Sequence, residues 1–569
     1  MKRRSRFLLL ALLIGCLMGG WLVWVRPENV DMAAYAPADS LLYLEANRPV
    51  EILDAVSGTD AWKAVANLTG TPASESQGRA LRALVRWTGL GPIRTVILAR
   101  SQVAVVISDL RTAEEGASLN VKTEGAFLIE THTSEGRIRP VVEETLKTLA
   151  ERTYGRPTER RTTIDGVEFV EWVAPDASRQ IVGATSGGLV IVGTSEHIVQ
   201  QCLAVAQKRA PSLSSDTELH AMRTRLASDR ALTFGYVPPA NSARLLAVAL
   251  PILLGRAPGD SQFQKLITNG ATKVFGSVGW TSSKYLTGIE DRYSINLAPS
   301  IVERLRPEFA SAGSNDQSNA SLPNVYSITK YEFANPLAAW QAMKTAVSSQ
   351  VDALSTILFS SLLKSALLSY GIDDPEAFLA AVDGNLQTLR LDGNSERSIL
   401  VGRVRDRASL RQLLLKTLLR VDSNLEVTAN AEMFSNPEQE IAAGLTNDLV
   451  VCGAATDVRR YLELSDDLNK NSALSNRMTF FAPPSPNSSV VTYADDSDRV
   501  RSFAATLIEA RAANVSSERL EAAVALLPYS VTETRLGERG IERTNRSPLG
   551  QFSSIVPLLF PEKSNAATR

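Results

Sequence analysis

Short segments from the first half of this chain recur in the second half in the same order. The series begins with Asn47 and Asn335, each close to a proline, and ends with Gly288-Ile289-Glu290 and Gly540-Ile541-Glu542. The pairs between them are Ala83-Leu84-Val85-Arg86-Trp87 and Ala366-Leu367-Leu368-Ser369-Tyr370, Leu146-Lys147-Thr148-Leu149 and Leu415-Lys416-Thr417-Leu418, Leu189-Val190-Ile191-Val192-Gly193 and Leu449-Val450-Val451-Cys452-Gly453, and Phe234-Gly235-Tyr236 and Val491-Thr492-Tyr493. The interval between partners only falls, from 288 to 252 residues, as loop deletions in the second copy would produce. This order predicts two copies of one domain.

The fold class follows from the pattern within each copy. Strand-like apolar segments alternate with amphipathic helices, and Asp165-Gly166 is a hairpin signal. Two copies are too few for a solenoid, so we expect two homologous α+β domains with mainly antiparallel sheets. The expected boundaries are 1–30 for a cytoplasmic stub and anchor, 31–309 for the first copy, 310–321 for a small, polar linker, 322–562 for the second copy and 563–569 for a tail.

The N-terminus has the sequence of a membrane anchor. Cations gather at Lys2, Arg3, Arg4 and Arg6, and the run from Phe7 to Val25 is uncharged. Such a run matches the ~20 helical residues that cross a ~30 Å hydrocarbon layer. Because the cations precede it, we expect one transmembrane helix, with the N-terminus in the cytoplasm and the body outside.

Two other interpretations compete with an anchor. A cleaved signal peptide has an apolar core of about 7–15 residues and then a cleavage site of small residues, whereas this run continues to Val25. Leu13-Ile14-Gly15-Cys16 resembles the lipobox of bacterial lipoproteins, in which Cys16 would carry the lipid, although apolar residues follow it. In the lipoprotein case as in the anchor case, the body is attached to a membrane.

Composition limits the class of protein and of partner. A length of 569 residues, with 44% hydrophobic and 21% charged residues, is typical of a globular protein with more than one core. A net charge of −1 gives no general attraction for nucleic acid. Cys452 takes the place of Val192 in the other copy, and Cys202 takes that of Leu462. Because both positions are apolar, we expect buried thiols and no disulfide.

Residues for catalysis or metal binding form no recognisable pattern. His132, His197 and His220 have no second His, Cys or paired carboxylate at metal-ligand spacing. Ser361 and Lys364 fit the S-x-x-K motif of penicillin-binding enzymes, but its companion motifs are absent and the surrounding leucines indicate a packed helix. We therefore expect no catalytic residue, no metal site and no cofactor, and we favour a protein that is not an enzyme.

One helical segment, from Leu337 to Ile372, is more apolar than a surface helix needs to be. The residues that follow helical spacing and would line a groove are Trp340, Met343, Val347, Leu354, Leu358 and Leu362. Packing within the core, or of one copy on the other, is one interpretation. The alternative is a hydrophobic groove for an acyl chain or a partner helix.

Three segments resemble a family of bacterial proteins. They are Tyr35-Ala36-Pro37-Ala38-Asp39-Ser40-Leu41-Leu42-Tyr43 just outside the anchor, Gly89-Leu90-Gly91-Pro92 after a helix, and Leu189-Val190-Ile191-Val192-Gly193-Thr194-Ser195 before one. They are similar to the exported, membrane-tethered proteins of unknown function that carry a "pro-ala-asp" strand and a "val-val-gly" strand before a helix. The resemblance implies a location in the cell envelope and this architecture. It implies no reaction and no catalytic residue.

The sequence thus predicts a single-pass protein of the bacterial inner membrane with its body in the periplasm. We expect it to bind or scaffold, with the bilayer as one partner through Phe7 to Val25 and with envelope proteins or lipid as others. Nucleic acid is not an expected partner. The first alternative is a carrier of lipid or another apolar ligand, and the second is a hydrolase of the cell envelope.

Overall fold

A computed structural model describes most of the body of the chain. The described residues are 29–68, 100–115, 118–253, 261–309, 325–393, 397–418, 425–427, 431–436, 440–470, 484–485, 487–511 and 515–554. The expected anchor Phe7 to Val25, Cys16, the linker 310–321 and the tail 563–569 lie outside them. Among the helices that are described, none combines the length and the apolar character that a membrane crossing needs.

The protein has an α+β fold built on one large antiparallel sheet. In the first half, the strands pair side by side in the order β4, β5, β6, β7, β3, β2, β1, β8, β9, β10. Their bounds are β1 Leu42–Ala46, β2 Gln102–Glu115, β3 Ser118–Glu130, β4 Thr158–Ile164, β5 Val167–Val173, β6 Gln180–Ser186, β7 Leu189–Gly193, β8 Thr233–Val237, β9 Phe275–Tyr285 and β10 Gly288–Leu297.

The second half repeats this strand order. From its outer edge inward it runs β14, β15, β16, β17, β13, β12, β11, β18, β19, β20, so β11 stands where β1 does and β20 where β10 does. The bounds are β11 Ser327–Glu332, β12 Val382–Arg390, β13 Ile399–Val404, β14 Leu425–Val427, β15 Glu432–Asn436, β16 Ile441–Leu445, β17 Leu449–Ala454, β18 Val490–Ala494, β19 Ser530–Leu536 and β20 Gly540–Ser547.

The two halves join through their last strands, β10 and β20. Ile289 lies opposite Ser547 and Asn296 opposite Gly540, which places Arg292 opposite Thr544. Arg292 and Thr544 are 252 residues apart, the same interval that separates Ile289 from Ile541. The register is therefore symmetric about this pair, as in the self-complementary interface of a two-fold dimer. Gly540 permits the close approach, because a Cβ there would lie 2.1 Å from the carbonyl oxygen of Ile295.

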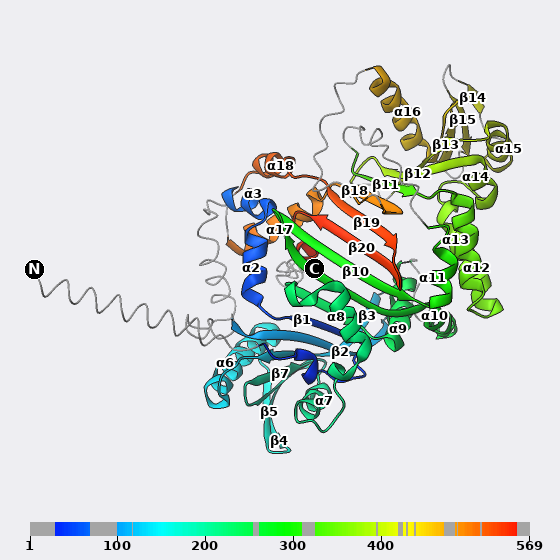
Figure 1. Ribbon diagram of the computed structural model, residues 1–569. Helices are drawn as coiled ribbons and strands as arrows, with labels where there is room; N and C mark the ends of the chain where they lie inside the picture. Colours follow the sequence, from blue (N-terminus) through cyan, green and yellow to red (C-terminus); the bar gives the residue numbers. More distant parts are fainter. Residues whose placement is uncertain are drawn as a thin grey trace, which may run out of the picture.

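Helices cover both the outer parts of the sheet and its centre. Figure 1 shows α6 and α7 with β4, β5 and β7 in one lobe, and α14 to α16 with β12 to β15 in the other, on either side of β10, β19 and β20. The bounds are α2 Pro49–Ser57, α3 Asp60–Leu68, α6 Glu135–Tyr154, α7 Glu196–Ala206, α8 Thr217–Leu226, α9 Pro239–Leu253, α10 Ser261–Val274, α11 Pro299–Leu305, α12 Pro336–Ser348, α13 Ala353–Leu368, α14 Pro375–Ala381, α15 Arg407–Leu418, α16 Ala455–Lys470, α17 Ser497–Arg511 and α18 Ser517–Val524, with short 3-10 turns at Met32–Tyr35, Leu213–Ser215 and Ser228–Arg230.

Each half also packs its first helices against the other half. The pair α2 and α3 forms an apolar cluster with α17 and α18, and Ile289 of β10 belongs to this cluster. The pair α12 and α13 packs against α10 and α11 of the first half, and Ile541, which corresponds to Ile289, lies in that cluster. The shared sheet and these two sets of helix contacts thus hold the halves together.

Both thiols outside the expected anchor are buried in separate cores. Cys202 lies on α7 in the first-half core and Cys452 lies on β17 in the second-half core, and each is a free cysteine. Burial raises the pKa of both thiols to about 12. Neither is therefore a reactive thiolate at neutral pH.

A buried carboxylate ties β10 to its neighbours. Asp291 is 1% exposed and accepts hydrogen bonds from Ser282 Oγ on β9, from Asn545 Nδ2 on β20 at 3.4 Å and from the backbone N–H of Gln551 at 3.0 Å. Burial raises the pKa of Asp291 above its ordinary value of 3.8, and the hydrogen bonds oppose that shift in part.

The raised pKa of Asp291 predicts how stability depends on pH. The folded chain holds this proton more tightly than the unfolded chain, so its contribution to stability is present below the unfolded pKa and is lost as the pH rises through the folded pKa. Asp291→Asn should reduce the fall in the free energy of unfolding as the pH rises from 4 to 8, measured by chemical denaturation. Asp229→Asn, at an exposed position, is the control. Equal pH dependences for Asp291→Asn and the unchanged chain would contradict the assignment.

Candidate functional site

The most distinctive concavity lies where α12 and α13 of the second half meet α9, α10 and α11 of the first. Local sequence fixes the two second-half helices. Asn335 caps α12 by accepting a hydrogen bond from Ala338 N, with Pro336 at the first helical position. Asp352 caps α13 by accepting hydrogen bonds from Ser355 N at 2.9 Å and from Ser355 Oγ at 3.0 Å.

A cavity of about 230 Å³, here called the junction cavity, opens between these helices. Its lining residues are Leu246, Ile267, Gly270, Ala271, Val274, Phe275, Leu297, Ile301 and Leu305 from the first half, and Met343, Val347, Val351, Ser355, Phe359, Leu362 and Ile541 from the second. Ser355 is the one polar side chain among these described residues, and its hydroxyl is bonded to the α13 cap. An apolar lining of this kind offers water few hydrogen-bond partners and accepts apolar groups.

Part of this lining was predicted from the sequence as an apolar groove. Met343, Val347 and Leu362 face the junction cavity. Trp340 instead lines a separate, charged cleft on the other side of α12. The side chains of Leu354 and Leu358 lie outside the part of the chain that the structure describes.

The first-half lining was missed for a physical reason. Ile267, Val274 and Ile301 belong to ordinary amphipathic helices, and nothing in their local spacing shows that they pack against the other half. The matching segments did contain one usable signal. They pair Ile541 with Ile289, and both residues lie in apolar clusters between the halves.

The equivalent junction at the other end of the β10–β20 pair is packed more fully. There Phe503 on α17 is fully buried and its ring meets Trp62 edge to face, with centroids 5.9 Å apart. Leu246 precedes Phe503 by 257 residues, the interval that also separates Arg244 from Arg501. A leucine thus stands at the junction cavity where the filled junction has a phenylalanine, and this difference in volume contributes to the space.

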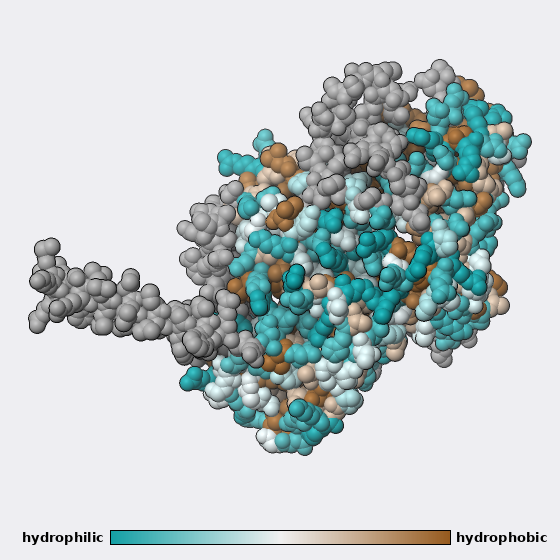
Figure 2. Space-filling view, in the orientation of Figure 1, coloured by the Kyte–Doolittle hydropathy of each residue, from teal (hydrophilic) through white to brown (hydrophobic). Residues whose placement is uncertain are grey.

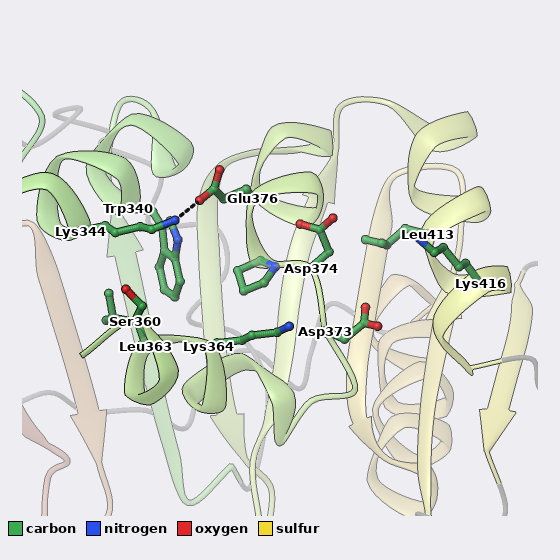
Figure 3. A pocket seen from close by; sticks show the side chains of 11 residues that line it. Trp340, Lys344, Ser360, Leu363, Lys364, Asp373, Asp374, Glu376, Leu413 and Lys416 are labelled. Carbon is green, nitrogen blue, oxygen red and sulfur yellow. Dashed lines mark hydrogen bonds and ion pairs between the residues drawn. The ribbon is translucent and has the colours of Figure 1, made fainter. Parts of the chain in front are cut away.

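The charged cleft lies against the opposite faces of α12 and α13 and measures about 450 Å³. Figure 3 shows Lys344, Lys364 and Lys416 around it together with Asp373, Asp374 and Glu376, and the indole of Trp340 on one wall. Consecutive residues therefore face different spaces, because Met343 lines the cavity and Lys344 the cleft.

The S-x-x-K residues and the histidines do not form a catalytic arrangement in the part of the chain that the structure describes. Ser361 and Lys364 are both exposed on α13, and no hydrogen bond joins them. The backbone of His132 bonds to Glu130, and the ring of His220 bonds to the carbonyl of Ser214. In the described ranges no group of three or more metal-ligating side chains gathers around one point.

Comparisons of the chain with protein-family models, curated proteins and solved structures gave no match. The resemblance to tethered envelope proteins therefore stays a prediction.

Filling the junction cavity should stabilise the protein. In delipidated full-length chain, Leu246→Phe should raise the free energy of unfolding by about 0.5–2 kcal/mol, because the ring would fill space that Phe503 occupies at the other junction. The reciprocal Phe503→Leu should lower it by about 0.5–3 kcal/mol by opening a void in a packed cluster. Chemical denaturation measures both, and a destabilised Leu246→Phe would show that no usable space exists there.

Proposed function

We propose that the chain is a membrane-anchored binding protein of the bacterial cell envelope that takes one acyl chain of a lipid in its junction cavity. The observation that carries this proposal is the apolar lining contributed by both halves. The lining offers no charged group among the described residues, so it suits retention of an apolar group and supplies no acid or base for a reaction.

The driving force would be the hydrophobic effect. A chain held in the cavity would be kept from release into water by about 0.8 kcal/mol for each buried CH₂, whereas exchange with the bilayer changes this term little. The cavity, at about 230 Å³, is smaller than the ~300–1,000 Å³ of sites that enclose drug-sized ligands. It therefore suits one segment of a chain, with the rest of the lipid outside. Figure 2 shows apolar residues reaching the surface beside the central sheet, near α11 to α13.

The tether supports lipid as the ligand class. Gln102 binds both backbone groups of Val30, accepting from its N–H at 2.7 Å and donating to its carbonyl at 2.9 Å. Asp31 pairs with Arg223 at 3.0 Å. The body is thus fixed from Val30 onward, and an extended chain from Val25 to Val30 spans at most about 18 Å. An anchor ending at Val25 would keep the body close to the bilayer, where acyl chains are abundant.

The proposal includes a duplicated body. Two homologous α+β domains, fused through β10 and β20, account for the equal strand orders and for the symmetric register about Arg292 and Thr544. The joined halves create two equivalent junctions, and the ligand would occupy the one that carries Leu246. A scaffolding role remains the alternative outcome if no lipid binds.

Lipid analysis of the purified full-length chain tests this proposal. Extraction followed by mass spectrometry should recover acyl lipid, and Leu246→Phe should reduce its amount per chain because the ring fills the cavity. The matched control is Leu526→Phe, the same change at a side chain that is 83% exposed. Both variants keep the N-terminal run, so lipid held around an anchor cancels in the comparison. Equal lipid in the two variants would refute binding in the cavity.

A further inference from the structure

One residue in the lining of the junction cavity is a glycine inside a helix. Gly270 lies within α10, which continues to Val274. Glycine is the poorest helix former after proline, because its backbone loses more conformational freedom on folding than that of any other residue. A glycine at this position therefore calls for a reason in the surrounding structure.

Neither the backbone nor the packing requires a glycine at position 270. Its φ angle lies outside the left-handed region that favours glycine. A Cβ there would lie 3.5 Å from Ser355 Oγ and 3.9 Å from Val351 Cγ1, which are ordinary van der Waals distances. The helix α18, which precedes β19 as α10 precedes β9, has Ala522 and Ala523 and no glycine. An alanine would thus fit and would favour the helix, so what the glycine provides is space.

Gly270 borders one end of the junction cavity. The second-half wall runs from Val351, just before α13, and Ser355 to Phe359 and Leu362, and Gly270 meets the first two of these residues. Ser355 is 6% exposed, and the lining residues of α10 on either side of Gly270 are buried as well. Phe359 and Leu362, in contrast, are only partly buried. The end beside Gly270 is therefore the enclosed one.

The enclosed end suits the methyl end of an acyl chain. Ser355 is the polar lining residue there, and its hydroxyl donates to Asp352 Oδ2 at 3.0 Å. A hydroxyl has one proton to donate, so none remains for the carbonyl of an ester. The polar end of a lipid thus finds no hydrogen-bond donor at this end, and it lies towards the partly exposed residues Phe359 and Leu362.

We propose that Gly270 sets the length of the acyl chain that the junction cavity accepts. This inference rests on the acyl site proposed above and adds the point at which the acyl chain stops. The terminal methyl group lies against the bare backbone of Gly270, where α10 packs beside α13 (Figure 1). In a closely packed space, a side chain at position 270 takes the place of the last carbons of the ligand. The site then prefers shorter acyl chains.

A mixture of lysophospholipids tests this role. Its saturated species share one head group, differ in acyl length and are present in equal amounts. Delipidated full-length protein is incubated with the mixture and repurified, and its bound lipid is quantified by mass spectrometry. Gly270→Leu should shift the bound lipid towards shorter acyl chains by about two to four carbons, because the new side chain takes up that space. Gly136→Leu is the matched control, since Gly136 is exposed on α6 and a Cβ there meets nothing within 4 Å.

Gly270→Ala keeps the test valid if the larger side chain impairs folding. The delipidated variant should resist chemical denaturation better than the unchanged protein, and it should shorten the preferred acyl chain by about one carbon. An unchanged length distribution in Gly270→Leu, with lipid still bound, would overturn the role of Gly270 and leave the acyl site standing. Equal loss of all lengths would also overturn it, because position 270 would then block the whole site. If the unchanged protein retains no more lipid than Leu246→Phe, the acyl site itself is refuted.

Discussion

The antiparallel pairing of β10 with β20 is the interaction on which the rest of the structure depends. It turns two sheets into one and sets the halves in a symmetric register about Arg292 and Thr544. On one face of this pairing, the guanidinium of Arg546 reaches Glu290 at 2.8 Å and Glu533 at 3.4 Å, with all three side chains largely buried. Arg292 also pairs with Glu290 at 2.7 Å, so two guanidinium groups balance the two carboxylates, as a buried position requires. The pairing of β10 with β20 also brings the first helices of each half against the other half, and so it forms both junctions.

The symmetry of the body makes its departures informative. At one junction Phe503 and Trp62 fill the space. At the other junction the smaller side chain of Leu246 leaves space unfilled, and that space is the junction cavity. A second hollow, the charged cleft with Lys364 and Lys416, lies on the face of α12 and α13 that points away from the junction cavity. Two equivalent interfaces in one chain can therefore differ in role, because one contributes packing and the other offers space for a ligand.

Local patterns in the sequence predicted local structure well. The apolar spacing of Ile138, Val141 and Leu146 places them on the buried side of α6, and Asp165-Gly166 turns the β4–β5 hairpin with positive φ at both residues. The apolar positions of Cys202 and Cys452 are buried in the structure.

Relations between distant segments could not be predicted in the same way. No periodicity shows which edge strands of two sheets will pair, so the single sheet through β10 and β20 was not foreseen. For the same reason Trp340 was grouped with Met343 in one expected groove, whereas Trp340 lines the cleft and Met343 lines the cavity. Positions three apart on a helix lie only about 60° apart around its axis, so residues of one stripe can border two spaces, and only the surrounding elements decide which space each residue meets.

Photocrosslinking would locate a bound acyl chain in the body. Full-length chain reconstituted with a lipid that carries a diazirine near the end of its acyl chain would be irradiated, digested and sequenced by mass spectrometry. We expect adducts on lining residues from both halves, such as Ile301 and Met343, together with any on the N-terminal apolar run. Adducts confined to Phe7 to Val25, with none on the lining of the junction cavity, would contradict a lipid site between the halves.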